Sequence, residues 1–182
     1  MTGLVRRWTE DDLPAVREVL RRSWESAYAS LIPLEDLRSY LDEHYSIDGL
    51  RRLTADPDVT GFVGVVGDRV VAMMRLKNDR DESRTYVSSI YVLPEQQGNG
   101  WGRRLMRVAA EQANIAGRTE LWLGVMTQNI QALAWYRSHG FIAVREEPFT
   151  MGRTAVAHLI GRLPVSSFLT ASTSGHPPEA QR

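Results

Sequence analysis

The feature that most constrains the fold is a glycine-rich turn, Gln97-Gly98-Asn99-Gly100-Trp101-Gly102, followed directly by Arg103 and Arg104. It separates a run rich in aromatic and β-branched residues, 84–93, from an apolar-periodic segment of about 100–116, and so predicts a strand, a turn and a helix. A helix N-terminus carries partial positive charge, and glycines let an anion approach the backbone closely. Arginines are unfavourable in a first helical turn unless an anion lies there. The turn therefore suggests an anion site, with an ordinary strand-to-helix connection as the alternative.

Two familiar phosphate-binding motifs do not fit this turn. The Walker pattern closes on Gly-Lys-Ser/Thr, a tripeptide that the sequence lacks. The dinucleotide fingerprint G-x-G-x-x-G requires a glycine at position 103, where this chain has arginine. A nucleotide-binding regulatory domain therefore loses its basis.

The periodicity of the remaining chain predicts an α/β domain with three layers around a mixed sheet. Helices are expected first, and a meander of strands follows them. The chain then alternates strand, helix and strand. The expected strands are 4–8, 60–66, 69–77, 84–93, 121–125, 141–146 and 155–163, and the expected helices are about 10–29, 33–45, 46–54, 100–116 and 130–138. Residues 1–163 are expected to form the domain, and the Ser-, Thr- and Pro-rich stretch 164–182 a disordered tail.

Composition narrows the chemistry and the partners. The 182 residues contain no cysteine, which excludes thiolate chemistry and suits a reducing cytoplasm. Lys and Arg (22) balance Asp and Glu (22), so bulk charge gives no reason to expect a nucleic-acid or membrane partner. The four histidines are scattered without ligand spacing, so no metal site is expected. No secretory signal and no apolar run of roughly 20 residues is visible.

A second motif gives the glycine turn its meaning. The segment 129–141 has the spacing N-x-x-A-x-x-x-Y-x-x-x-G-F, formed by Asn129, Ala132, Tyr136 and the pair Gly140-Phe141. Together with the turn and the preceding "IYVLPE", they resemble the GNAT superfamily of acyl-CoA-dependent N-acetyltransferases. The resemblance covers about residues 3–163. Shorter strings at 39–46, 121–129 and 147–152 are similar to the branch of bacterial spermidine and spermine acetyltransferases.

The resemblance implies a sheet that splays between its fourth and fifth strands, with acetyl-CoA lying between them. The backbone freed by the splay would bond the acetyl carbonyl and the pantetheine arm, and the amides of the turn would hold the pyrophosphate. Arg103 would reach phosphate, and Arg104 and Arg107 would either do the same or lie on a solvated helix face. Asn129 would bond the pantetheine arm or cap its helix. The implied cofactor-binding residues are Ile90, Val92, Gln97, Gly98, Asn99, Gly100, Gly102, Arg103, Asn129 and Tyr136.

The expected reaction is attack of a neutral amine on a thioester. The amide of Val92 is the expected donor to the developing oxyanion. By its place in the motif, Tyr136 either protonates the CoA thiolate or hydrogen-bonds its sulfur. Many family members carry a carboxylate base on the strand before the turn, where this chain has Ser88 and Ser89. Water relayed to Glu35, Asp42, Glu43 or His44 is the alternative left open.

The expected acceptor is a primary amine, with polyamines favoured. Tyr28, Tyr40, Asp42, Glu43 and Tyr45 could receive cationic amines by charge and cation–π contact. The alternative for these aromatics is that they only pack the first helices on the body. Protein, peptide and antibiotic amines remain open as acceptors, as does a non-catalytic acyl-CoA-binding or regulatory module. The resemblance also implies a homodimer through the C-terminal strands, and Trp101 could pack in the core or lie at an interface.

Overall fold

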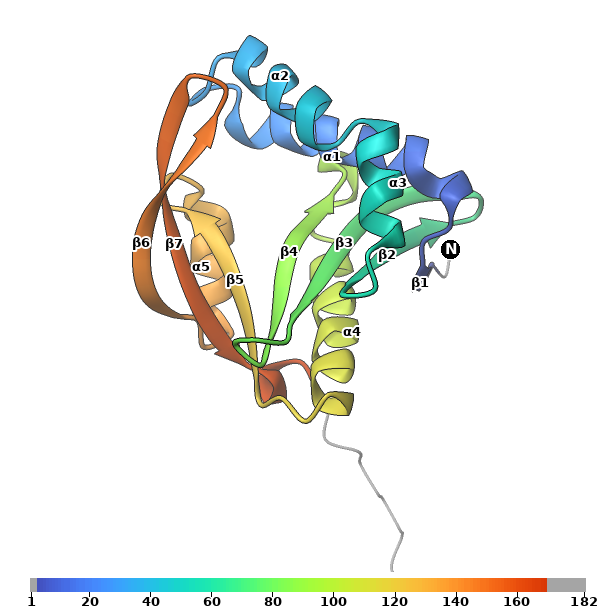
Figure 1. Ribbon diagram of the computed structural model, residues 1–182, viewed down its shortest axis with the longest axis vertical. Helices are drawn as coiled ribbons and strands as arrows, with labels where there is room; N and C mark the ends of the chain where they lie inside the picture. The colour runs from blue at the N-terminus through green and yellow to red at the C-terminus, as the bar shows by residue number, and fades with distance from the viewer. Residues whose placement is uncertain (1–2, 170–182) are drawn as a thin grey trace, which may run out of the picture.

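The computed structural model describes residues 3–169, which form a mixed sheet with helices on both faces (Figure 1). Across the sheet the strands follow the order β1-β2-β3-β4-β5-β7-β6. All neighbouring strands are antiparallel except β4 and β5, which are parallel. The strands are β1 (Leu4–Arg7), β2 (Val59–Val66), β3 (Arg69–Asp79), β4 (Arg84–Val92), β5 (Glu120–Met126), β6 (Ile142–Met151) and β7 (Thr154–Pro164).

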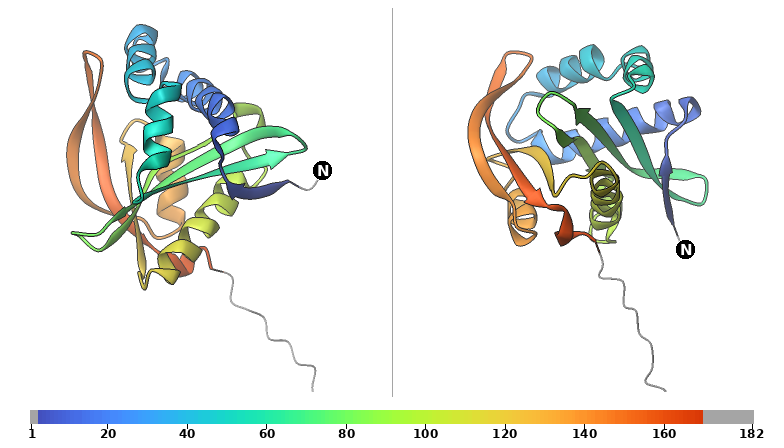
Figure 2. Two further views of the ribbon diagram at one scale, coloured as in Figure 1. Left: turned by 45° about the vertical axis from the view of Figure 1, so that its right-hand side comes forward. Right: turned by 60° about the horizontal axis from the view of Figure 1, so that its bottom comes forward.

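The helices form the two outer layers, which confirms the predicted three-layer α/β fold. Figure 2 shows α1, α2 and α3 on one face of the sheet and α4 and α5 on the other. The helices are α1 (Leu13–Tyr28), α2 (Leu34–His44), α3 (Ile47–Ala55), α4 (Trp101–Ile115) and α5 (Ile130–Ser138), with short 3₁₀ turns at Glu10–Asp12, Pro94–Gln96 and Val165–Ser167. Most predicted boundaries lie within two residues of these. The larger differences are at the first helix, whose expected start at 10–12 is a 3₁₀ turn, and at β6, which continues to Met151 beyond its expected end at 146.

The start of the first helical segment is fixed by a buried carboxylate. The backbone N–H of Thr9 donates to the Asp12 carboxylate at 2.7 Å, and the Arg6 guanidinium donates to it twice, at 2.6 and 2.8 Å. The Arg6 hydrogen bonds hold the pKa of Asp12 at about 2. Because Arg6 belongs to β1, this ion pair ties the edge strand to the beginning of α1.

Trp101 packs in the core. Its side chain is buried, and its ring lies against the backbone of two glycines. A Cβ added to Gly3 or Gly64 would lie only 2.5 or 2.6 Å from ring atoms of Trp101. The absence of side chains at these two positions is what admits the indole, which anchors the first turn of α4 against β1 and β2.

The sheet parts between β4 and β5. Their register covers only Thr85–Val87 against Leu121–Leu123. Beyond these three pairs, β4 continues beside β3 and β5 continues beside β7, but neither pairs with the other. We call this opening, bounded by Ser88–Val92 and Gly124–Met126, the gap. It confirms the expected splay between the fourth and fifth strands.

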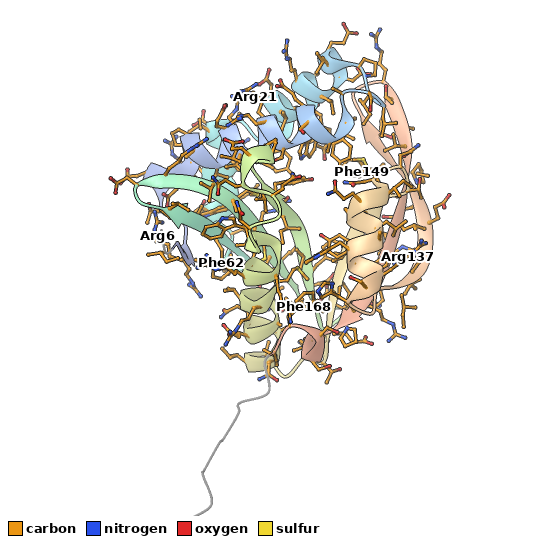
Figure 3. The ribbon with its side chains drawn as sticks, turned by 180° about the vertical axis from the view of Figure 1, so that it is seen from behind. Arg6, Arg21, Phe62, Arg137, Phe149 and Phe168 are labelled. Carbon is orange, nitrogen blue, oxygen red and sulfur yellow. The ribbon has the colours of Figure 1, made fainter. Side chains whose placement is uncertain are left out.

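The domain extends past the expected boundary at Pro164. Pro164 closes β7, and Val165 and Phe168 are buried. Phe168 stacks on His139 at 4.9 Å between ring centroids, and Figure 3 shows it beside α4 and α5. The prediction of disorder is therefore wrong for residues 164–169, because it was based on composition, whereas burial and the contact of Phe168 with His139 hold this segment in place. The rest of the predicted tail, 170–182, lies outside the described residues. No helix among residues 3–169 is long and apolar enough to cross a membrane.

Candidate active site

The gap exposes backbone groups of β4. The Leu93 N–H donates to the Val71 carbonyl at 2.9 Å, so Leu93 directs its backbone toward β3. Backbone groups alternate in direction along a strand, and the register is unbroken from Ala72–Val92 to Met74–Ile90. Ile90 and Val92 therefore direct their backbone groups into the gap. The Val92 carbonyl accepts from the Ser23 hydroxyl (3.1 Å) and the Gln97 amide (3.3 Å), which leaves the Val92 N–H as its available group.

The glycine turn, Gln97–Gly102, presents its amides at the end of the gap. Gly98 and Gly100 both have φ of 78°, a conformation that side chains disfavour, and nothing lies within 4 Å of a Cβ placed at either. Within the described chain, the N–H groups of Gly98, Asn99 and Gly100 donate to no backbone acceptor. Since α4 begins at Trp101, its positive end faces the same space. This is a ready site for an anion.

The arginines after the turn differ in whether they already have partners within the protein. Arg103 is exposed, and within residues 3–169 no acidic side chain pairs with it. Arg104 donates to the Gly3 carbonyl and lies over the Trp101 ring, 4.3 Å from its centroid. Arg107 pairs with Glu111 at 3.0 Å on the exposed face of α4. Arg103 is thus the arginine available to an anion at the turn.

Asn129 begins α5 and joins it to α1. Its side-chain oxygen accepts from the Ala132 N–H at 3.1 Å, which caps the helix. Its amide nitrogen donates to the Tyr28 hydroxyl at 3.2 Å. The expected cap is therefore present, and the second bond links the two helix layers across the gap.

Tyr136 lies on the buried face of α5 with 7% of its surface exposed. Burial, followed by the nearby Tyr28, raises its pKa well above the usual value for a tyrosine. Its hydroxyl has no hydrogen-bond partner among the residues that the structure describes. The phenol therefore remains protonated over the physiological range and is available to donate.

The first helices bring aromatic side chains together on the opposite face. Trp24 lies 5.3 Å from Tyr40, 5.9 Å from Tyr45 and from Tyr91, and 6.2 Å from Tyr28, between ring centroids. We call these five residues the aromatic cluster. Phe149 of β6 extends it, 5.6 Å from Tyr40 (Figure 3). Tyr28, Tyr40 and Tyr45 were predicted for the substrate site, and Trp24 was considered beside them for packing or a pocket role, whereas Tyr91 and Phe149 were missed. Tyr91 stands two residues after Ser89 in the same strand, which was an available signal.

The acidic residues predicted near the tyrosines have different partners. Asp42 pairs with Arg17 of α1, and Glu35 pairs with Arg153 at the turn between β6 and β7. Glu43 is exposed and 3.8 Å from His44, whose ring lies 4.2 Å from that of Tyr40. Arginines therefore engage Asp42 and Glu35. Glu43 lies one helical turn after Tyr40, and burial, followed by Tyr45 and the charge of Glu43, raises the pKa of that tyrosine.

Ser89 stands on β4, where the resemblance implies a carboxylate base in many family members. It is buried, and its hydroxyl lies 3.4 Å from that of Tyr45. Arg75 of β3 approaches the same tyrosine, 5.4 Å from its ring centroid. The register shifts here, since Arg75 pairs with Ser89 and Leu76 with Val87, so Ser88 is an extra residue in β4. No carboxylate of β4 reaches this position.

Comparisons with known proteins agree with this geometry. Residues 13–141 match the family model described as the acetyltransferase (GNAT) family. A spermidine N(1)-acetyltransferase of Thermoplasma acidophilum is 26% identical over 142 residues, 75% of this chain and 86% of that protein. An uncharacterized N-acetyltransferase of Lactobacillus delbrueckii is 26% identical over 159 residues, 84% of this chain and 92% of the other. Among solved structures, the PaiA N-acetyltransferase of T. acidophilum in complex with coenzyme A has a TM-score of 0.76 at 23% identity, over 90% of this chain and 99% of the other.

Proposed function

Because the chain belongs to the acetyltransferase (GNAT) family and is an N-acetyltransferase that uses acetyl-CoA as co-substrate, we propose that it acetylates a primary amine, with a polyamine as the favoured acceptor. The observation that carries this proposal is the gap between β4 and β5, with the open glycine turn at its end. The gap offers unpaired backbone groups for an amide-containing chain, and the turn offers N–H groups for phosphate.

The residues of the gap and the turn suit acetyl-CoA. The amides of Gly98, Asn99 and Gly100 and the side chain of Arg103 would hold the pyrophosphate. The backbone of Ile90 and Val92 would bond the pantetheine arm and the acetyl carbonyl. Gln97 would keep the turn against β4, as its bond to the Val92 carbonyl already does. A Cβ placed at Gly102 would lie 3.7 Å from the Trp135 ring, an ordinary van der Waals contact, so α4 and α5 approach each other at this end of the turn.

The chemistry follows from where these groups lie. The neutral amine attacks the carbonyl carbon of the thioester, a C–N bond forms, and negative charge develops on the carbonyl oxygen. The Val92 N–H would stabilise that charge, and loss of one such donor typically costs about 2.7–4 kcal/mol. As the C–S bond breaks, Tyr136 would donate its proton to the thiolate or hydrogen-bond the sulfur. Burial keeps the phenol protonated for either role.

The aromatic cluster supports a cationic acceptor. Ring faces attract ammonium groups, and a polyamine carries amines that remain charged while one of them reacts. Arg75 already contacts the Tyr45 ring, and Trp24 and Tyr28 are buried, so the half-buried Tyr40 is the ring of the cluster that a ligand would reach first. The similar protein from T. acidophilum is a spermidine N(1)-acetyltransferase, which favours the same acceptor class here.

The decisive experiment is an acceptor screen. Acetyl-CoA is mixed with spermidine, spermine, aminoglycosides or peptides with free amino termini, and released CoA is followed with a thiol reagent. The chain contains no cysteine, so the thiol signal comes from CoA alone. Saturable release with spermidine, and acetylspermidine in the mass spectrum, would support the proposal. Saturation by a peptide or an aminoglycoside instead would overturn the polyamine assignment. Tight acetyl-CoA binding without release for any amine would favour a binding module.

The free edge of the sheet supports the expected homodimer. β6 is the last strand in the order, and its Ile142 and Val144 are 58% and 51% exposed. Pairing of two copies along β6 would cover both side chains. Light scattering after gel filtration would give twice the chain mass for a dimer, and Val144→Lys would reduce it to a monomer. A monomer at micromolar concentration in the unmodified protein would contradict this assembly.

A further inference from the structure

The proposed reaction lacks an identified proton acceptor. As the amine nitrogen forms its bond to carbon, it must lose a proton. Ser88 and Ser89 cannot take that proton at neutral pH. Asp42 and Glu35 are paired with arginines on other elements, and Glu43 and His44 are exposed at the end of α2. The other wall of the gap, formed by β5 and its neighbour β7, offers a different group.

His158 of β7 lies directly over Gly124 of β5. A Cβ placed at Gly124 would lie 2.1 Å from Cε1 and 2.4 Å from Nε2 of the imidazole, so the ring rests where any side chain at 124 would have to be. Gly124 is the first residue of β5 beyond its last pair with β4, Leu123 with Val87. The far end of the imidazole therefore lies at the mouth of the gap, level with Ser88 and Ser89.

The imidazole also lies on the acceptor's side of the sheet. Phe149 is 5.2 Å from His158 and 5.6 Å from Tyr40, between ring centroids, so the ring continues the aromatic cluster. Tyr136 belongs to α5, on the opposite face. An amine arriving from the aromatic cluster would meet His158 on its own side, while the thiolate would leave toward Tyr136.

The surroundings favour a neutral imidazole at neutral pH. Burial lowers the pKa of His158 below its usual value, while the Gly124 backbone and the Glu147 carboxylate act in the opposite direction. Glu147, opposite His158 on β6, also pairs with Arg145 at 3.0 Å. From β4, Tyr86 faces the same carboxylate, and burial followed by Glu147 raises its pKa to about 12, so it stays neutral. From the helix layer, the uncharged Tyr40 lies behind Phe149, which contacts both Tyr40 and the imidazole.

We propose that His158 is the general base of the acetyl transfer. This rests on the proposed function. The amine lone pair forms the C–N bond, the N–H proton passes to the free ring nitrogen of His158, and the C–S bond breaks to release the thiolate, which is protonated in turn. Glu147 stabilises the resulting imidazolium. Glycine at 124 is required because it leaves room for the ring beside the reacting nitrogen.

The first test compares the kcat of His158→Gln with that of His139→Gln, using the acceptor amine identified by the screen as substrate. His139 lies at the end of α5 against Phe168, away from the gap, so its variant should keep wild-type kcat. His158→Gln should lower kcat by about 10²-fold or more, the usual contribution of a general base, with unchanged affinity for CoA. The ratio of wild-type to variant kcat/KM cancels the ionisation of the amine itself. This ratio should fall as the pH drops through a pKa below 6.5.

Chemical rescue separates a base from a structural residue. His158→Ala leaves a ring-sized space, and added imidazole should restore kcat in proportion to its neutral form. Three results would each overturn the proposal. These are full activity in His158→Gln, a ratio of wild-type to variant kcat/KM that does not vary with pH, and loss of CoA binding in both His158→Gln and His158→Ala. Inactive wild-type protein with every amine would instead refute the proposed function, so the two failures are distinguishable.

Discussion

At the scale of single residues, the site depends on groups whose chemical state is set by their surroundings. Tyr136 is ordinary as an amino acid, but burial and the neighbouring Tyr28 raise its pKa and keep it protonated. Burial has the opposite effect on His158, whose pKa it lowers. In both cases the uncharged form is favoured, because burial penalises charge. A protonated phenol and a neutral imidazole are the forms that an acid and a base require.

Tyr136→Phe tests the acid at this scale. We expect kcat to fall by about 10- to 100-fold, with the KM for acetyl-CoA within a factor of about three, because only the proton donor is lost. Since the folded pKa lies above the ordinary value of about 10, wild-type kcat should show no loss from ionisation of this phenol up to pH 9. Steady-state kinetics between pH 6 and 10 measure both. A wild-type alkaline limb near pH 8 that vanishes in the variant would contradict the assignment.

At the scale of elements, the two ends of α4 make an instructive pair. Gly100 precedes the helix with φ of 78°, and Gly117 follows it with φ of 71°. Both conformations disfavour a side chain, and neither glycine has a neighbour within 4 Å of an added Cβ. The backbone strain of an alanine would therefore be similar at both ends, but only the N-terminal end faces the gap.

Gly100→Ala and Gly117→Ala should therefore separate stability from binding. We expect each to reduce the free energy of unfolding by about 1 kcal/mol, because alanine is strained at positive φ. Only Gly100→Ala should weaken CoA binding, by about tenfold, since it perturbs amides that would hold phosphate. Urea denaturation and calorimetry give the two quantities. Equal CoA affinity in both variants would remove the turn from the phosphate site.

At the scale of the whole molecule, the sheet is divided into two parts joined by three residue pairs of β4 and β5. Asn129 and Tyr28 add one hydrogen bond between the helix layers at the gap. A ligand lying in the gap would contact both parts and should stabilise the folded state by binding to it alone. The gap that makes room for the ligand therefore also makes the stability of the folded protein depend on the ligand.

Acetyl-CoA should therefore raise the thermal midpoint measurably. At 100 times its Kd, the gain is about 2.7 kcal/mol, which corresponds to roughly 5–10 °C for a domain of this size. Arg103→Ala should reduce the shift at the same concentration, whereas Arg107→Ala should not, because Arg107 pairs with Glu111. Differential scanning fluorimetry measures all three. An equal shift for both variants would exclude a phosphate contact by Arg103.

The sequence determined what is local: strand and helix periods, the Asn129 cap, the glycine turn and, through two spaced motifs, the family and the parting of β4 from β5. Only the tertiary structure placed His158 over Gly124, because these residues are 34 positions apart and meet through the pairing of β5 with β7. It also paired Asp42 with Arg17 of α1, since the element that a side chain of α2 meets depends on how that helix packs. Local order follows from short-range backbone preferences, whereas a site built from distant strands depends on the register in which they pair.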